Sequence, residues 1–210
     1  MIRVSIADDH AVVRRGLVEI LNDTPDIEVL DEAAAGDELL LALRRRRPDV
    51  AVLDLRMPGP SGLDLIKHLR TEFPEVRILI LSANPEDQYA VRVVRAGAHG
   101  YLTKESAEAD LVRAVHRVAG GKRFLTQGMA EALLDQLDAD PEETPHAQLS
   151  DREFQVMRLI ASGLPVSAIA DRLKLSVKTV STYRTRLLQK MGFENNAEIT
   201  RYAIERGLDE

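Results

Sequence analysis

The chain has 210 residues, enough for one large domain or two small ones, and its 45% hydrophobic and 30% charged residues are ordinary for a globular protein. It contains no cysteine, which excludes disulfide frameworks and thiolate metal sites and fits a reducing compartment. No apolar run approaches membrane-spanning length, and the first ten residues lack the apolar core of a signal peptide. We therefore expect a cytoplasmic protein without a membrane partner.

The net charge of −6 is divided unevenly along the chain. Residues 1–148 carry 18 basic and 26 acidic side chains, a balance of −8, whereas residues 149–210 carry 10 and 8, a balance of +2. A strongly basic chain would indicate a nucleic-acid partner, and this chain is not basic as a whole. The asymmetry nevertheless leaves such a partner open for the C-terminal part.

Short apolar runs alternate with helical patterns in the first 120 residues. The runs predict five strands, at Ile2–Ala7, Glu28–Ala34, Val50–Asp54, Arg77–Leu81 and His99–Thr103. The longer stretches predict five helices, at His10–Leu21, Asp37–Arg46, Gly62–Thr71, Glu86–Ala96 and Ala107–Ala119. This alternation predicts an α/β domain with a doubly wound, five-stranded parallel sheet.

The remainder of the chain changes character twice. Gly120-Gly121 ends the fifth helix, and a linker is expected over residues 122–148, with a helix at about 126–137 and an Asp-, Glu- and Pro-rich stretch after it. Residues 149–210 then show four helical patterns and no strand pattern, at about 151–162, 166–173, 177–191 and 196–206. We therefore predict an α/β domain at 1–121 and an all-α domain at 149–210.

Polar side chains stand where the predicted strands end. They are Asp8 and Asp9 after the first strand, Asp54 at the end of the third, Ser82 after the fourth and Lys104 after the fifth. The carboxyl ends of parallel strands share one edge of the sheet, where ligands usually bind. We therefore expect three carboxylates, a hydroxyl and an ammonium to converge there.

These groups suit the transfer of a phosphoryl group. Three neighbouring carboxylates repel one another, and oxygen ligands without His or Cys favour a hard cation, Mg²⁺ or alternatively Mn²⁺. A carboxylate such as Asp54 can itself be the nucleophile and form an aspartyl-phosphate. Lys104 can then pair with the added oxygens and Ser82 can donate a hydrogen bond to them. Taken singly, however, Asp8-Asp9 reads as a helix N-cap and Lys104 as a solvated side chain.

Residues 1–120 resemble the receiver domain of bacterial response regulators, which has a flavodoxin-like fold. The matching residues are Asp8-Asp9, Asp54 with Met57-Pro58 and Gly62, Ser82-Ala83, and Gly100-Tyr101-Leu102-Thr103-Lys104. The resemblance implies that Asp54 accepts the phosphoryl group from a histidine kinase or a small acyl phosphate. It also implies that Asp9, Asp54 and the carbonyl of Arg56 hold Mg²⁺ with help from Asp8, and that Tyr101 is a switch residue moving with Ser82.

Two other functions are compatible with an acidic cluster of this kind. A metal-dependent phosphatase with an Asp nucleophile needs a general acid, and the similar haloacid-dehalogenase motif has a second Asp where this chain has Arg56. A regulator that works without phosphorylation would keep the site as a remnant. All five strand-end positions are filled, so we expect a regulator that is not an enzyme and that responds to phosphorylation.

The C-terminal pattern predicts a helix-turn-helix. Ala168–Leu173 and Val177–Lys190 are joined by a short turn, and the second helix carries four cations and no acidic residue. Short hydroxyl side chains accompany the cations, and both kinds of group contact phosphates and base edges. A small helical bundle with a solvated basic face is the bland alternative.

Residues 149–208 resemble the LuxR-type DNA-binding domain, and the two domains together resemble the NarL/FixJ class of response regulators. The matches include Leu149-Ser150-Asp151-Arg152-Glu153, Ile169-Ala170, Ser176–Val180 and Lys190-Met191-Gly192. The resemblance implies that Ser181, Thr182 and Thr185 face the bases of double-stranded DNA. It places Lys178, Thr179, Tyr183, Arg184 and Arg186 near phosphates, and it implies a dimer contact through the last helix, Ala197–Arg206. The expected consequence of phosphorylation is a homodimer, or release of the recognition helix from the receiver.

Two places in the C-terminal domain depart from the common pattern of the LuxR-type family, and two features of the first domain are interpreted as structural. Val166-Ser167-Ala168 stands where the family often has Asn-Lys-Glu, and Tyr183 where it usually has His, so affinity and target preference are expected to differ. The run Arg44–Arg47 is expected to be a solvated helix end. His10 is expected to be an edge or capping residue and not a metal ligand.

Overall fold

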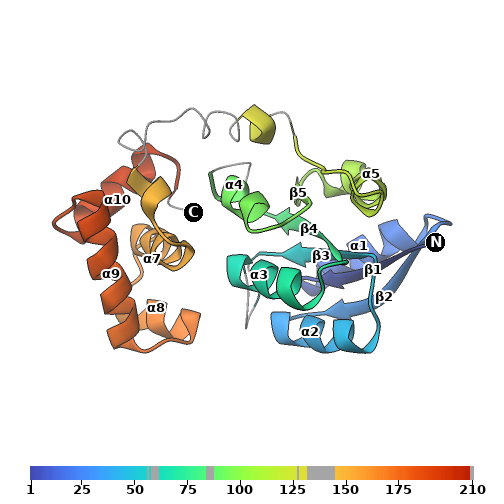
Figure 1. Ribbon diagram of the computed structural model, residues 1–210, viewed down its shortest axis with the longest axis horizontal. Helices are drawn as coiled ribbons and strands as arrows, with labels where there is room; N and C mark the ends of the chain where they lie inside the picture. The colour runs from blue at the N-terminus through green and yellow to red at the C-terminus, as the bar shows by residue number, and fades with distance from the viewer. Residues whose placement is uncertain (56, 58–61, 84–87, 127, 132–144, 209–210) are drawn as a thin grey trace. The chain divides into compact units, whose positions relative to one another are not determined.

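The computed structural model describes residues 1–55, 57, 62–83, 88–126, 128–131 and 145–208. It divides into two compact units, Met1–Glu131 and Ala132–Glu210. The first unit contains a β-sheet flanked by helices, and the described part of the second consists of helices and their connections (Figure 1).

The first unit is built on a five-stranded sheet. Its strands are β1 (Ile2–Ala7), β2 (Ile27–Ala33), β3 (Val50–Asp54), β4 (Arg77–Ser82) and β5 (Gly100–Thr103). Neighbouring strands are parallel throughout, in the order β2-β1-β3-β4-β5. The predicted α/β fold with a doubly wound parallel sheet is confirmed, with strand bounds that differ by at most one residue.

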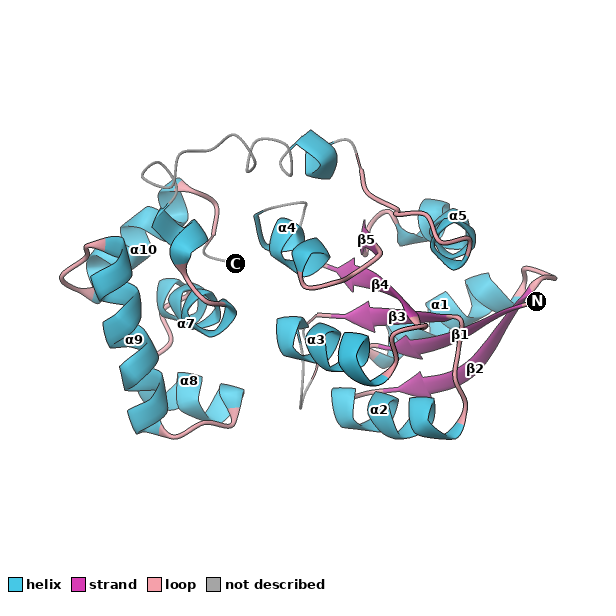
Figure 2. Ribbon diagram, in the orientation of Figure 1, coloured by secondary structure: helices cyan, strands magenta, loops and turns pink. Residues whose placement is uncertain are grey.

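Helices cover both faces of this sheet. They are α1 (Ala11–Asn22), α2 (Gly36–Arg45), α3 (Gly62–Glu72), α4 (Gln88–Arg95) and α5 (Ala107–Ala119). Helices α2, α3 and α4 lie on one face and α1 and α5 on the other (Figure 2). Because both faces are covered, every residue of β3 is buried, which explains the continuous apolar run that predicted this strand.

The core between α1, α5 and the sheet is aliphatic. Leu17 and Leu21 of α1 and Leu111 and Val115 of α5 pack on alternate strand residues such as Val52. These side chains are at most 3% exposed. Burial of each such side chain contributes about 1.5–3 kcal/mol, so this layer holds the strand ends in place.

The segment after α5 differs from the prediction, which began the linker at residue 122. Phe124 is buried, its N–H donates to the carbonyl of His99 at 3.0 Å, and its carbonyl accepts from the N–H of Tyr101 at 3.0 Å. The backbone groups on the open edge of β5 thereby gain partners. Residues 122–131 therefore belong to the first unit. The predicted helix at about 126–137 is helical at 128–131 and otherwise lies largely outside the described residues.

The second unit contains four α-helices in its described part. A 3₁₀-helix, η1 (Pro145–Gln148), precedes α7 (Asp151–Ala161), α8 (Val166–Leu173), α9 (Val177–Met191) and α10 (Asn196–Glu205). Ser150 and Glu153 form the capping box at the start of α7. The four predicted helices are confirmed.

The predicted linker is also shorter at its C-terminal end. His146 of η1 is 1% exposed and lies against Phe154, with its Nδ1 2.6 Å from the Tyr202 hydroxyl. Residues 145–148, assigned to the linker on their composition, therefore pack into the second unit. Their polar and Pro-rich character did not indicate the aromatic pocket that receives His146.

The turn between α8 and α9 is short and well defined. Helix α8 ends at Lys174, whose φ of 54° places it in the left-handed region. The Ser176 hydroxyl then accepts the Thr179 N–H at 3.0 Å and caps α9. Ile169 of α8 and Val180 of α9 are both fully buried.

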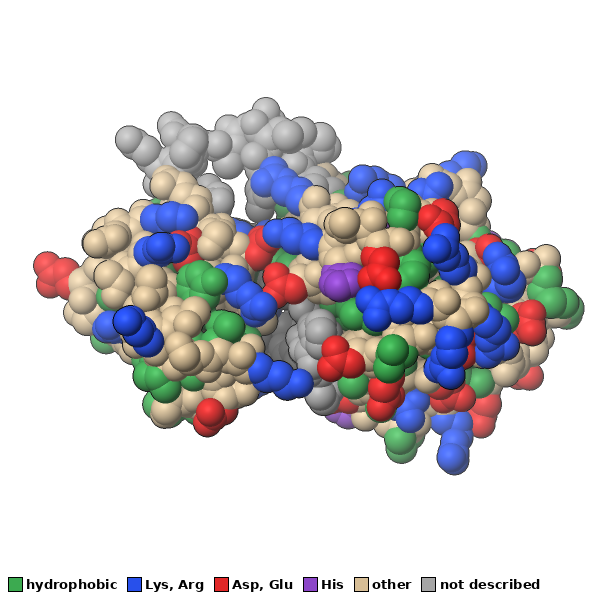
Figure 3. All heavy atoms as spheres, turned by 60° about the horizontal axis from the view of Figure 1, so that its bottom comes forward, with side chains coloured by type: hydrophobic (Ala, Val, Ile, Leu, Met, Phe, Trp, Pro, Cys, Tyr) green, Lys and Arg blue, Asp and Glu red, His purple; other side chains and the backbone are tan. Residues whose placement is uncertain are grey.

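The four arginines at the end of α2 have partners within the protein in addition to solvent. Three of them pair through exposed guanidinium groups with acids of other elements: Arg44 with Glu72, Arg46 with Asp31 and Arg47 with Glu75. The fourth, Arg45, donates to the carbonyl of Leu41. Basic and acidic side chains alternate over the face of the first unit in Figure 3. The prediction of a solvated helix end is corrected to this extent, because the fold brings acids of β2 and of the α3 end within reach. Across the described residues, no helix has the length and apolar character needed to cross a membrane.

Candidate phosphoacceptor site and nucleic-acid interface

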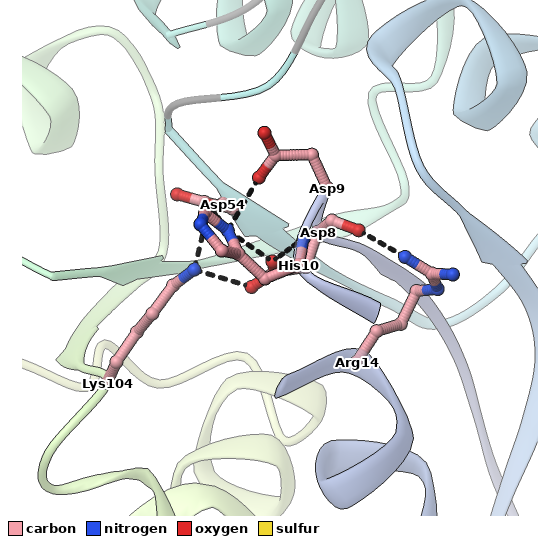
Figure 4. Close-up of polar contacts among 6 residues, drawn as sticks. All are labelled: Asp8, Asp9, His10, Arg14, Asp54 and Lys104. Carbon is pink, nitrogen blue, oxygen red and sulfur yellow. Dashed lines mark hydrogen bonds and ion pairs between the residues drawn. The ribbon is translucent and has the colours of Figure 1, made fainter. Parts of the chain in front are cut away.

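The carboxyl edge of the sheet brings three strand ends together. The Lys104 ammonium, just after β5, lies 2.8 Å from Asp54 Oδ2 at the end of β3 and 2.7 Å from Asp8 Oδ2 just after β1 (Figure 4). The Lys104 N–H also donates to the carbonyl of Ser82, at 2.7 Å. The strand register thus places Asp8, Asp54 and Lys104, which are distant in the sequence, around one point.

The carboxylates at this point are deeply buried. Asp8 and Asp54 have side chains 1% and 3% exposed, and Lys104 is 17% exposed. Burial by itself lowers the pKa of Lys104, but its hydrogen bonds to Asp54 and Asp8 outweigh burial and raise the pKa above its ordinary value. The lysine therefore stays charged, and it offsets the cost of burying two carboxylates.

Asp9 and His10 form the more exposed side of this cluster. The side chain of Asp9 is 31% exposed, and its Oδ1 lies 2.7 Å from His10 Nδ1. His10 precedes α1 as its N-cap residue without a side-chain capping bond, and its backbone N–H donates to Asp8 Oδ1 at 2.8 Å. The predicted edge position holds, but the imidazole faces the acidic residues rather than capping the helix.

The donor set fits a hard divalent cation. One ligand atom from each of Asp8, Asp9, His10 and Asp54 lies within 4.8 Å of the others. Carboxylate oxygens of this number and spacing are the ligands that Mg²⁺ and Mn²⁺ prefer. The Arg56 carbonyl, which was predicted as a further ligand, lies outside the described residues.

The other two predicted residues of the site are buried beside it. Ser82 ends β4 and is 4% exposed, and Tyr101 of β5 is 1% exposed. Tyr101 pairs with Ile80 across the β4–β5 ladder. Its neighbour Leu102 belongs to the core under α5, so alternation places Tyr101 on the face covered by α3 and α4.

One residue at this site was missed. Arg14 of α1 donates from its guanidinium to the carbonyl of Asp8 at 2.6 Å. In the sequence it appears only as one of two adjacent arginines in an amphipathic helix, and nothing in that pattern indicates which one reaches the strand end.

Helix α9 carries the predicted nucleic-acid interface. Five of the eight predicted residues form one exposed stripe: Lys178, Ser181, Thr182, Thr185 and Arg186. Thr179, Tyr183 and Arg184 are half-buried beside it. Within the described residues, no hydrogen bond or ion pair engages the side chains of Lys178 and Arg186. Two hydroxyls already donate within the helix, Thr182 to the Lys178 carbonyl and Thr185 to the Ser181 carbonyl.

The remaining two cations of α9 have structural partners. Arg184 Nε donates to Asn196 Oδ1 at 2.6 Å, and Lys190 Nζ donates to Glu153 Oε2 at 2.6 Å. Lys190 also reaches the carbonyl of Gln148 in η1, at 3.3 Å. They therefore join α9 to α10 and to the start of α7, a role that charge patterning did not indicate.

The acidic site and helix α9 each lie within a segment that matches a known protein family. Residues 4–116 match the family described as "Response regulator receiver domain". Residues 147–203 match the family described as "Bacterial regulatory proteins, luxR family". The first match covers the acidic site and the second covers α9.

Characterised relatives match over nearly the whole chain. "Response regulator UvrY" of Escherichia coli K12 is 36% identical over 209 residues, covering 99% of this chain and 96% of its own length. "DNA-binding transcriptional activator DevR/DosR" of Mycobacterium tuberculosis is 38% identical over 206 residues, covering 98% and 95%.

Solved structures of similar proteins also match over nearly the whole chain. A structure of the Salmonella typhimurium RcsB response regulator has 29% identity, covers 97% of both chains and gives a TM-score of 0.76. An RcsB–DNA complex, also 29% identical, covers 97% and 98% with a TM-score of 0.62. A further RcsB structure, 30% identical over 97% and 98% of the chains, contains two RcsB dimers on two parallel DNAs and has a TM-score of 0.62.

Proposed function

Because the chain belongs to the NarL/FixJ class of two-component response regulators, with a receiver and a LuxR-type DNA-binding domain, we propose that phosphorylation of Asp54 controls its binding to DNA. The observation that carries the proposal is the placement of Lys104 against the buried carboxylates of Asp8 and Asp54. A carboxylate paired with an ammonium at the edge of a parallel sheet is suited to nucleophilic attack.

The proposed reaction transfers one phosphoryl group. An Asp54 oxygen attacks the phosphorus of a phosphohistidine on a histidine kinase, or of a small acyl phosphate, and the bond from phosphorus to the donor breaks. The product is an aspartyl-phosphate, and the donor leaves with the bonding electron pair. Lys104 then pairs with the phosphoryl oxygens and Ser82 donates a hydrogen bond to them.

A divalent cation belongs to this reaction. Asp8, Asp9 and Asp54, with the Arg56 carbonyl, would hold Mg²⁺ or Mn²⁺. When bound, the cation supplies neutralisation of the phosphoryl charge. Asp9, the least buried of the three carboxylates, offers the cation access from solvent.

The proposed consequence is a shift between two arrangements of the receiver. Phosphorylation adds negative charge and strong hydrogen-bond acceptors beside Lys104 and Ser82. Movement of Ser82 and the buried Tyr101 would bias the packing of α4, β5 and α5 toward a state that forms a homodimer. The dimers and DNA complexes of the RcsB relatives support this proposal.

In the second unit, α9 is the proposed recognition helix. Ser181, Thr182 and Thr185 would face the bases, with Lys178 and Arg186 on phosphates and Thr179, Tyr183 and Arg184 beside them. A homodimer presents two such helices to a two-fold site in double-stranded DNA.

Intact mass tests the phosphoacceptor. After incubation with Mg²⁺ and a small acyl phosphate, we expect the wild-type chain to gain one phosphoryl group and Asp54→Ala to gain none. Asp23→Ala, which removes an exposed carboxylate at the end of α1, is the matched control and should gain one. The same gain in Asp54→Ala would refute the assignment.

A DNA-binding measurement tests the consequence. We expect the phosphodonor to raise the affinity of the wild-type chain for its DNA site and to leave that of Asp54→Ala unchanged. Equal affinity with and without the donor would support instead a regulator that works without phosphorylation.

A further inference from the structure

Arg14 connects the acidic site to two other elements. Its side chain is 19% exposed, and one guanidinium nitrogen donates to the Asp8 carbonyl at 2.6 Å. Its Nε donates to Glu32 Oε2 of β2 at 3.3 Å. Figure 4 shows the guanidinium on the side of Asp8 away from Lys104, so it contacts the backbone of the site and not the carboxylates that face Lys104.

The Asp8 carbonyl needs such a donor. The β1–β2 pairing ends at Ala7 and Ala33, and the β1–β3 pairing ends at Ala7 and Leu53. The Asp8 N–H still donates to the Ala33 carbonyl at 3.1 Å, but the Asp8 carbonyl lies beyond the ladder. A backbone carbonyl in a buried residue is costly without a hydrogen bond, and Arg14 supplies one.

The bond also sets the direction of Asp9. The Asp8 carbonyl lies in the peptide plane that joins Asp8 to Asp9, and this plane fixes the position of the Asp9 Cα, from which the side chain leaves the backbone. The Asp8 carboxylate is already held by Lys104 and by the N–H of His10. The Asp9 side chain is 31% exposed and has its closest ion-pair contact with His10, itself 64% exposed. Besides its contact with His10, Asp9 is therefore constrained by the orientation of this peptide.

We propose that Arg14 is a positioning residue of the acidic site. It holds the Asp8–Asp9 peptide so that the Asp9 carboxylate faces the other two, and Glu32 holds the guanidinium in place. The proposal rests on the proposed function, since it concerns how the same site binds its divalent cation. Partners in the shell outside metal ligands commonly change metal affinity by 10- to 100-fold when they are removed.

Calorimetric titration of the full chain with Mg²⁺ tests this role. Arg14→Met keeps an unbranched side chain about as long as the aliphatic part of arginine and removes the donor, and we expect about tenfold weaker binding. Arg15→Met, one residue along the same helix and exposed, removes the same charge and should stay within about twofold of wild type. If Arg14 acted only through its charge, its removal beside three carboxylates would strengthen Mg²⁺ binding, so equal or tighter binding by Arg14→Met overturns the proposal.

The rate of phosphoryl uptake adds a second readout. For Arg14→Met we expect a slow rate at low Mg²⁺ that recovers to near the wild-type rate at saturating Mg²⁺. A rate that stays low at saturation would show general damage to the site and would overturn the proposal.

Two controls keep the outcomes distinguishable. If Arg14→Met does not fold, Arg14→Lys retains the charge but cannot reproduce the guanidinium fork, and we expect at least threefold weaker Mg²⁺ binding; equal binding would overturn the proposal. Failure of the wild-type chain to bind Mg²⁺, or phosphoryl gain by Asp54→Ala, would instead refute the proposed function.

Discussion

The acidic site of the receiver and the exposed stripe of α9 use charge in opposite ways. At the acidic site, Asp8, Asp54 and Lys104 come from three strand ends and are buried against one another. On α9, Lys178 and Arg186 lie on one helix, eight residues apart, and are exposed to solvent. The receiver thus surrounds its proposed nucleophile with fixed partners, whereas α9 keeps Lys178 and Arg186 exposed to solvent.

The difference fits what each site is proposed to bind. A small phosphoryl group and a metal ion need several groups converging on one point, which a single helix cannot supply. DNA phosphates lie along an extended surface, so one exposed helix face can meet several of them. We therefore expect substitutions in the receiver to change stability most and substitutions on the α9 stripe to change binding with little effect on stability.

The largest effect is expected for Lys104→Met. The substitution leaves the buried carboxylates of Asp8 and Asp54 facing each other without a cation, and loss of one partner of a buried pair costs about 3 kcal/mol. Amide hydrogen exchange of the first-unit strands, without divalent ions, measures this loss. Lys122→Met removes an exposed charge and should change little. A loss below about 1 kcal/mol for Lys104→Met would contradict the view that the receiver depends on this pairing.

In the described part of the second unit, a buried carboxylate also pairs with a lysine, whose side chain is 40% exposed. Glu153 has a side chain 4% exposed, caps the N-terminus of α7 and accepts from Lys190 at 2.6 Å. We expect Glu153→Ala to reduce the stability of this unit by about 2 kcal/mol, measured by hydrogen exchange in α7 and α9. Glu205→Ala, an exposed acid on α10, is the control. If Glu153→Ala and Glu205→Ala reduced the stability equally, the pairing of Glu153 with Lys190 would not stabilise this unit in the way proposed for the receiver.

The pairing of Glu153 with Lys190 also predicts that the stability of the second unit falls at acid pH. Burial raises the pKa of Glu153, but hydrogen bonds from Lys190 and Ser150 outweigh it and lower the pKa below the ordinary value of 4.5. Its stabilisation is therefore present above about pH 4.5 and is lost as the pH falls through the lower folded pKa. Glu153→Gln should remove this part of the acid dependence of hydrogen exchange in α7.

An exposed cation of α9 should affect binding only. Lys178→Ala is expected to weaken DNA binding about tenfold and to lower the slope of log affinity against log salt by about 1, because one phosphate contact is lost. Stability should be unchanged. Arg201→Ala, an exposed cation on α10, should leave the slope unchanged. An unchanged slope for Lys178→Ala would exclude Lys178 from the phosphate contacts.

The smallest effect concerns His99 in the receiver, away from both sites. Burial and the charges of Arg77, Arg70 and Arg123 lower the pKa of His99 to about 4, and its Nδ1 accepts the Ile78 N–H at 3.0 Å. Since the folded pKa lies below the ordinary 6.5, stability falls as the pH drops from about 6.5 toward 4. The ring is partly exposed, so we expect a loss of only about 1 kcal/mol.

His99→Asn sharpens this last prediction. The amide oxygen of asparagine can accept the same Ile78 N–H but does not titrate. Hydrogen exchange of β4 between pH 4 and 6.5 should therefore lose part of its pH dependence in this variant. An identical pH profile would show that His99 does not contribute.

Much of the acidic site was predictable because its residues stand at recognisable places. Asp8, Asp54, Ser82 and Lys104 each follow an apolar run, and the rule that parallel strands end at one edge brings them together. Arg14 was not predictable in this way, since its role depends on the reach of one side chain from α1 to a carbonyl beyond the β1 ladder.

The segment between the two domains shows the opposite case. Residues 122–148 were interpreted as linker from their polar and Pro-rich composition, yet Phe124 completes the edge of β5 and His146 packs between Phe154 and Tyr202. Composition averages over a segment, so it does not register single residues that occupy a pocket formed elsewhere.

By itself, the sequence determined the order and type of the elements, the two-domain division and the residue types at the sheet edge, because hydrophobic period and turn residues are local properties. Only the tertiary structure decided which atoms meet: Lys104 with both Asp8 and Asp54, Arg14 with the Asp8 carbonyl, and Arg184 and Lys190 with partners that hold α9 in place. These contacts depend on side-chain reach between elements distant in the chain, and that reach is set by how the elements pack.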